Sequence, residues 1–205
     1  MSPLDFYAHV SAAMQDPPVE RHARLRVIHQ EALAVYVQGL AAVSADQVAR
    51  PQPVSGDART VAEIVAHIEA WDRFALMAAG DVLAGIRHPR MVTDLSGYVE
   101  TDGSAVAFAS IDAFNDYQAR RSRAWTWDDL KGRAAASATT LCALFEHPTL
   151  LNADRLEAGE HHHKRLHNGS VLNDIAMGWH LWLTMIEHIA VEHRNLIEWM
   201  AGMSD

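Results

Sequence analysis

Histidine and glutamate side chains in two stretches of the sequence have the types and spacing of a metal site. In the last thirty residues, His188 and Glu192 stand four apart and share one helical face, while His193 falls inside the apolar stripe beside Ile189. In an earlier stretch, His67 lies on the inward side of a predicted helix. Burying imidazole or carboxylate is costly without a partner. Two helices that direct such groups into a shared interior are how helical bundles build metal sites.

The candidate ligands are His67, His188, Glu192 and His193, and His180 belongs to the same pool of histidines. Three protein ligands and one open position are the arrangement of a catalytic zinc or a similar divalent ion, and two histidines with a glutamate would serve as well as three histidines. The spacing also fits another interpretation, because an isolated inward histidine is more often hydrogen-bonded in a core than bound to metal. His193 is the better buried of the C-terminal candidates, whereas His188 and Glu192 have the better mutual geometry.

A second histidine cluster, Glu160-His161-His162-His163, resembles a set of ligands at first sight. Adjacent histidines in a loop cannot all face one ion, so we predict a solvated loop, with adventitious metal capture as the alternative. The single cysteine, Cys142, lies in an apolar run and is expected to be a small core residue.

Four long helices are needed to position these groups, and the apolar periodicity predicts them. They cover residues 19–43, 60–77, 126–145 and 171–203. The second begins at Thr60 with a capping-box pattern completed by Glu63, and the third is capped by Thr126 or Asp128. Shorter helices are expected at 4–14 and 110–123, a crossover loop at 87–103 and another loop at 156–169. No segment gives a serious strand signal.

This order of elements predicts an all-α fold, a four-helix bundle with a long crossover between helices two and three. At 205 residues we expect one domain over 1–205, with 1–18 as a short N-terminal extension. Four buried apolar stripes, at about 25 cal/mol per Å² of apolar surface, are enough to hold such a bundle without metal. A bound ion would therefore be functional before it was structural.

Composition excludes several classes of function. The formal charge of −9, with no basic patch, argues against a nucleic-acid partner. There is no run of about eighteen apolar residues and no secretion signal, so we expect no membrane association and a cytoplasmic protein. No glycine-rich phosphate loop, nucleophile elbow or Cys-x-x-Cys pair is present, so phosphoryl transfer, serine hydrolysis and thioredoxin-type exchange lack support.

One phrase of the sequence resembles the second-helix signature of the DinB-like superfamily, and particularly of its ClbS/DfsB branch. It runs Thr60-Val61-Ala62-Glu63-Ile64-Val65-Ala66-His67-Ile68-Glu69-Ala70-Trp71-Asp72. Weaker similarity to the same branch continues in Phe114-Asn115, in Trp127-Asp128-Asp129-Leu130 and in Glu187-His188-Ile189-Ala190-Val191-Glu192-His193. The resemblance covers nearly the whole chain from about residue 20.

The resemblance implies an up-down-down-up bundle and, as in many members, a divalent ion held by one histidine of the second helix and two of the fourth. Zinc and nickel are the ions expected, and the second-helix ligand falls on His67. The fourth helix departs from the pattern, because the position four after His188 is Glu192 and the histidine lies five along, at His193. Five residues do not return to one face of an α-helix. Glu192 replaces a histidine, or His193 binds without His188, or the metal has been lost.

The function expected is therefore a divalent-metal-dependent enzyme acting on a small-molecule substrate, of hydrolase or thiol-dependent transferase type, with a pocket at the bundle mouth. The alternative is a metal-free small-molecule binding or sequestration protein of the ClbS/DfsB type. A third possibility is a structural homodimer that uses the exposed parts of helices one and four. Trp71, one turn after His67, is either core or a wall of the pocket.

Overall fold

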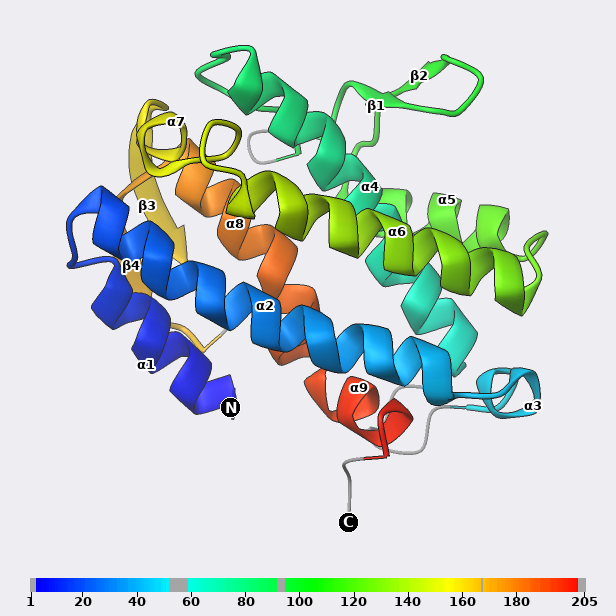
Figure 1. The fold of residues 1–205 in the computed structure, drawn as a ribbon. Helices are drawn as coiled ribbons and strands as arrows, with labels where there is room; N and C mark the ends of the chain where they lie inside the picture. The colour runs from blue at the N-terminus through cyan, green and yellow to red at the C-terminus, as the bar shows by residue number, and fades with distance from the viewer. Residues whose placement is uncertain (1–2, 52–58, 92–94, 167, 203–205) are drawn as a thin grey trace.

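Helices make up most of the protein (Figure 1). The computed structural model describes residues 3–51, 59–91, 95–166 and 168–202. The helical elements are α1 (Pro3–Ala13), α2 (Pro18–Ala42), α3 (Ala45–Val48), α4 (Val61–Leu83), α5 (Ile111–Ser122), α6 (Trp127–Glu146), α7 (Ala153–Glu157), α8 (Met177–Glu187), a π-helical turn η1 (His188–Glu192) and α9 (Arg194–Met200).

Four long helical segments form the bundle. Helix α2 packs against α6 and α9, and α4 packs against α6 and α8, so that α2, α6, α4 and the segment α8–η1–α9 close a ring around the core. The predicted mostly helical, all-α fold built on four long segments is confirmed. The up-down-down-up order of helix directions stays a prediction.

Local signals fixed where the helices begin. Thr60 caps α4 by accepting a hydrogen bond from the Glu63 backbone N–H at 3.2 Å, and the Glu63 carboxylate accepts one from the Thr60 backbone N–H at 2.8 Å. Thr126 caps α6 in the same way through the Asp129 backbone N–H. The predicted capping box and the Thr126 alternative for the third helix are both confirmed.

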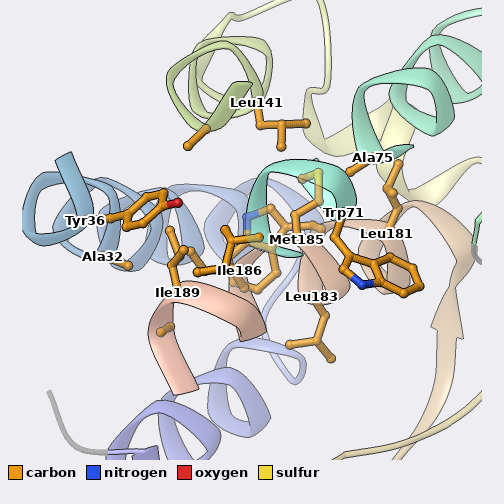
Figure 2. Packing of buried hydrophobic residues seen from close by; sticks show 14 of the residues in the cluster. Ala32, Tyr36, Trp71, Ala75, Leu141, Leu181, Leu183, Met185, Ile186 and Ile189 are labelled. Atoms are coloured by element: carbon orange, nitrogen blue, oxygen red, sulfur yellow. The ribbon is translucent and has the colours of Figure 1, made fainter. Parts of the chain in front are cut away.

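The core is filled from all four segments, and Figure 2 shows Tyr36 of α2, Trp71 of α4, Leu141 of α6 and Ile186 of α8 meeting in it. Cys142 is buried there as expected. Helix α1 belongs to this core as well, since Phe6 and Val10 are completely buried. The N-terminal segment therefore contributes to the packing of the core, and the single domain over 1–205 stays a prediction.

Two short β-hairpins interrupt the helical pattern. One pairs β1 (Tyr98–Val99) with β2 (Ala105–Val106) inside the crossover. The other pairs β3 (His161–Arg165) with β4 (Val171–Ala176) and leads directly into α8. Our predictions of no strand, of a loop over 156–169 and of a final helix from residue 171 were wrong here. Strand propensity is weak in a sequence such as His161–Arg165, and the pairing is stabilised by packing against α8, which sequence periodicity does not report.

No helix in the described part of the chain combines the length and apolar character that crossing a bilayer requires.

Candidate metal centre

The fourth long segment is not a continuous α-helix where the candidate ligands lie. Residues His188–Glu192 form a π-helical turn, in which the His193 backbone N–H donates to the His188 carbonyl oxygen at 3.0 Å. Such a turn holds one residue more than an α-helical turn, so a residue five along returns to the same side. The expectation that His188 and His193 cannot share a face assumed α-helical geometry and was wrong.

The π-helical turn meets α4 at His67. The ring centroid of His67 lies 5.4 Å from that of His188 and 5.5 Å from that of His193. His67, Glu192 and His193 each offer one ligand atom, and these three atoms lie within 4.8 Å of one another. Among the described residues, this is the group of three that could hold an ion. His67 and His193 are half-buried and Glu192 is exposed, so the group opens to one side.

His188 lies next to this group of three without belonging to it. Its Nδ1 is 3.1 Å from the Thr184 carbonyl oxygen, one turn earlier in α8, and its Nε2 is 3.6 Å from a carboxylate oxygen of Glu192. Trp71 covers the other side, with its ring stacked on that of His188 at 5.7 Å and 23°. His188 is thus oriented toward Glu192, as a group that supports a metal ligand would be.

Asn115 of α5 ties the aromatic side of the site together. Its Oδ1 accepts a hydrogen bond from the Trp71 indole N–H at 3.0 Å, and its side chain also interacts with His67. Burial, followed by the neighbouring His188, His193 and Arg59, lowers the pKa of His67 to about 2. The ring is therefore neutral at pH 7, which is the form that binds metal.

The donor set fits a divalent ion. Two imidazole nitrogens and one carboxylate oxygen are a known three-ligand set of catalytic zinc. A tetrahedral ion with bonds of about 2.0–2.1 Å needs donor atoms about 3.4 Å apart. The separations of up to 4.8 Å found here are somewhat wider than this value.

The candidate ligands line one wall of a cavity of about 610 Å³. Trp71 also lines it, which answers the question of whether this tryptophan is only core. The cavity is further lined by residues from five parts of the chain, namely Arg59, Met91, Leu95, Ile111, Asn115, Lys164, His180, Thr184 and Glu187. A cavity of this size accommodates a small organic molecule.

A polar chain that sequence reasoning missed lies beside this cavity. Glu187 is almost completely buried; it accepts a hydrogen bond from the Tyr7 hydroxyl at 3.2 Å and lies 3.8 Å from the Lys164 ammonium. It joins α1, β3 and α8. Nothing in the sequence signals the contact, because its three members are far apart in the chain.

The histidine run is a strand rather than a solvated loop. His161 and His163 are exposed on β3, whereas His162 is half-buried and lies against His180 of α8. The run does not join the group formed by His67, Glu192 and His193, and the alternation of the strand separates its members onto two faces.

Comparison with known proteins gives a likeness of fold. No protein-family model matches the sequence, and no curated protein matches it. The structure is similar to a crystal structure of the mycothiol-dependent maleylpyruvate isomerase, with a TM-score of 0.54 and 13% identity over 92% of this chain and 61% of the isomerase chain. A histidine-to-alanine mutant of that isomerase gives 0.53 and 12% over 86% and 59%.

The class of protein defined by these observations is a helical bundle with the fold of the mycothiol-dependent maleylpyruvate isomerase. At this identity the likeness concerns the fold alone. The chain spans about three fifths of the length of the solved structures that it matches.

Proposed function

We propose that this protein is a divalent-metal-dependent enzyme that acts on a small molecule in the cavity beside η1. The observation that carries the proposal is the convergence of His67 from α4 with Glu192 and His193 from the π-helical turn, three donor atoms within 4.8 Å at the wall of a 610 Å³ cavity. A bundle of this size does not need such a group for stability, and a π-helical turn is frequently a functional feature.

In the proposed enzyme His67, Glu192 and His193 hold the ion, and zinc or nickel suits two nitrogens and one oxygen. The ion, when bound, polarises a substrate group or activates a thiol or water. His188 holds Glu192 in place, while Trp71 forms an apolar wall against which the substrate packs. Of the two reaction types considered, the likeness of fold to a thiol-dependent isomerase favours the thiol-dependent type over a hydrolase of the ClbS/DfsB branch.

The metal content of the purified protein tests this proposal. Tag-free protein is loaded with zinc or, separately, with nickel, desalted and examined by elemental analysis. His67→Ala is treated in parallel, and His163→Ala, at an exposed histidine of β3, is the control. We expect about one ion per chain in the wild type and in His163→Ala, and a loss in His67→Ala. A wild type that takes up neither zinc nor nickel, or an ion that survives His67→Ala, would reject the metal site.

A metal-free binding protein is the second candidate, favoured by the partners that His67 and His188 already have within the protein, the Asn115 side chain and the Thr184 carbonyl oxygen. Within the metal-dependent proposal, the thiol-dependent reaction type is tested separately, with cobalt(II) in place of zinc and 2-mercaptoethanol as the probe. A sulfur-to-cobalt charge-transfer band is expected if a thiol reaches the ion. Its absence, with cobalt bound, would favour the hydrolase type.

A further inference from the structure

The cavity wall contains a lysine whose ammonium group finds little hydrogen bonding within the protein. Lys164 of β3 lines the cavity, and 15% of its side chain is exposed. Its Nζ lies 3.8 Å from a carboxylate oxygen of Glu187, a distance that makes an ion pair but is too long for a hydrogen bond. Among the described residues, no side chain or carbonyl accepts a hydrogen bond from this ammonium. Burying a charged group whose donors are unused is costly, so the arrangement favours an acceptor that enters from the cavity.

The hairpin β3–β4 turns Lys164 toward the cavity. On β3, His162 and Lys164 are half-buried while the residues on either side of them are exposed. The pairing with β4 is irregular between these two residues, because Asn173 and Asp174 lie opposite His163 alone. Asp174 has a φ of 55°, in the left-handed region that residues other than glycine rarely adopt. Such a bulge re-aims the side chains beside it, and the hairpin packs against α8 (Figure 1).

The groups that face the ammonium leave room for an anion. Glu187 is the negative group beside Lys164, and it also accepts a hydrogen bond from the Tyr7 hydroxyl. His162 and His180 face Lys164 as well, and burial followed by Lys164 lowers the pKa of both, that of His180 to about 3. Both rings are therefore neutral at pH 7.

Distance decides between attraction and repulsion at this place. An anionic oxygen that is hydrogen-bonded to Nζ from the cavity, on the side away from Glu187, lies about 2.8 Å from Nζ. It lies farther from the Glu187 carboxylate, so its attraction to Lys164 exceeds its repulsion by Glu187. A neutral acceptor gains less, because a hydrogen bond between two charged groups is stronger than one with a neutral partner.

We propose that Lys164 is a ligand-recognition residue whose ammonium binds a carboxylate of the small molecule held in this cavity. The ligand class is therefore an ionised carboxylic acid. Arg59, the other basic side chain of the wall, is among the neighbours that lower the pKa of His67 and so lies toward the other end of the cavity. Positive charge at both ends disfavours a cationic ligand. The inference rests on the proposed function only in taking this cavity as the ligand site, and it does not need the ion.

Three probes of nearly the same shape and different charge test the proposal, namely benzoate, benzamide and benzamidine. Each is titrated into the full chain with chelator present, so that benzoate cannot bind through a metal ion, and binding is followed by NMR of the probe. We expect benzoate to bind about tenfold more tightly than benzamide, the effect of one charge-assisted hydrogen bond, and benzamidine to bind least. Absence of benzoate binding, equal binding of benzoate and benzamide, or preference for benzamidine would overturn the proposal.

Substitution of the lysine assigns the preference to this side chain. We expect Lys164→Met to abolish the preference for benzoate and Lys164→Arg, which keeps the charge, to retain it. The matched control is Lys131→Met, at the other lysine of the chain, which lies on α6 outside the cavity. A preference that survives Lys164→Met would place the carboxylate elsewhere and reject the assignment.

A second measurement needs no variant, should Lys164→Met fail to fold. In protein labelled with carbon-13 lysine, benzoate should shift the Cε signal of Lys164 and leave that of Lys131 unchanged. An unchanged Lys164 signal at saturating benzoate would contradict the proposal. Elemental analysis of the same preparation reports on the metal site separately. A protein that takes up no ion yet prefers benzoate would reject the metal proposal and support the role of Lys164.

Discussion

The backbone N–H of His193 donates a hydrogen bond to the carbonyl oxygen of His188, five residues earlier, at 3.0 Å. This bond defines the π-helical turn. The turn places the ring centroid of His193 5.5 Å from that of His67. The candidate metal centre therefore depends on one backbone irregularity in the fourth helical segment.

The two proposed ligands of the π-helical turn, Glu192 and His193, should differ from His188 in their effect on zinc affinity. We expect Glu192→Gln and His193→Gln each to weaken binding by more than about 100-fold, and His188→Gln by about 10–100-fold, the range of groups that support a ligand. A competition titration against a chromophoric chelator measures these affinities. If His188→Gln has the largest effect, His188 is a ligand. If none of the three changes affinity, these side chains serve packing.

Removing one residue from the π-helical turn should separate stability from metal binding. Deletion of Val191 leaves α8 and α9 in register, because a π-helical turn is a one-residue insertion in an α-helix. We expect the free energy of unfolding to rise by about 0.5–2 kcal/mol, as when a functional irregularity is removed, and zinc affinity to fall. Urea unfolding and the chelator titration measure the two effects. A deletion variant that is less stable yet still binds zinc would contradict this account.

Close packing of α8 against α7 should make Gly178 irreplaceable. A Cβ at Gly178 would lie 2.6 Å from the Leu156 Cα and would also overlap the Leu156 carbonyl oxygen, whereas a Cβ at Gly132 of α6 meets nothing within 4 Å. We expect Gly178→Ala to destabilise the protein by about 3 kcal/mol or to prevent folding. Gly132→Ala should instead stabilise it by about 0.5–1 kcal/mol, because glycine is unfavourable within a helix. Thermal unfolding compares the two, and equal effects would mean that α7 can move away from α8.

The buried His29 should make stability depend on pH in a definite direction. Burial lowers its pKa to about 4, opposed by Glu146, so below pH 6.5 the unfolded chain binds a proton that the folded protein does not. The contribution of His29 to the free energy of unfolding is therefore constant above pH 6.5. It falls by about 3 kcal/mol as the pH drops toward 4. His29→Gln should remove that part of the pH dependence. His9→Gln, at an exposed histidine, should leave it, and identical profiles for the two variants would contradict the assignment.

Much of this protein was determined by the sequence alone. Thr60 with Glu63 predicted the start of α4, Thr126 that of α6, and apolar periodicity the inward placement of His67 and the buried stripes of the bundle. These features are local, since a cap or a helical face depends on residues a few positions apart.

The tertiary structure decided the rest. The period of an α-helix places His193 on a different face from His188. Packing of α8 and α9 against the other helices accompanies the π-helical turn that brings His193 to His67. The hairpin that joins His162 to His180, and the contact of Tyr7 with Glu187, link residues 18 and 180 positions apart. Such contacts form when distant elements bury surface together, and the spacing of residues along one helix carries no record of them.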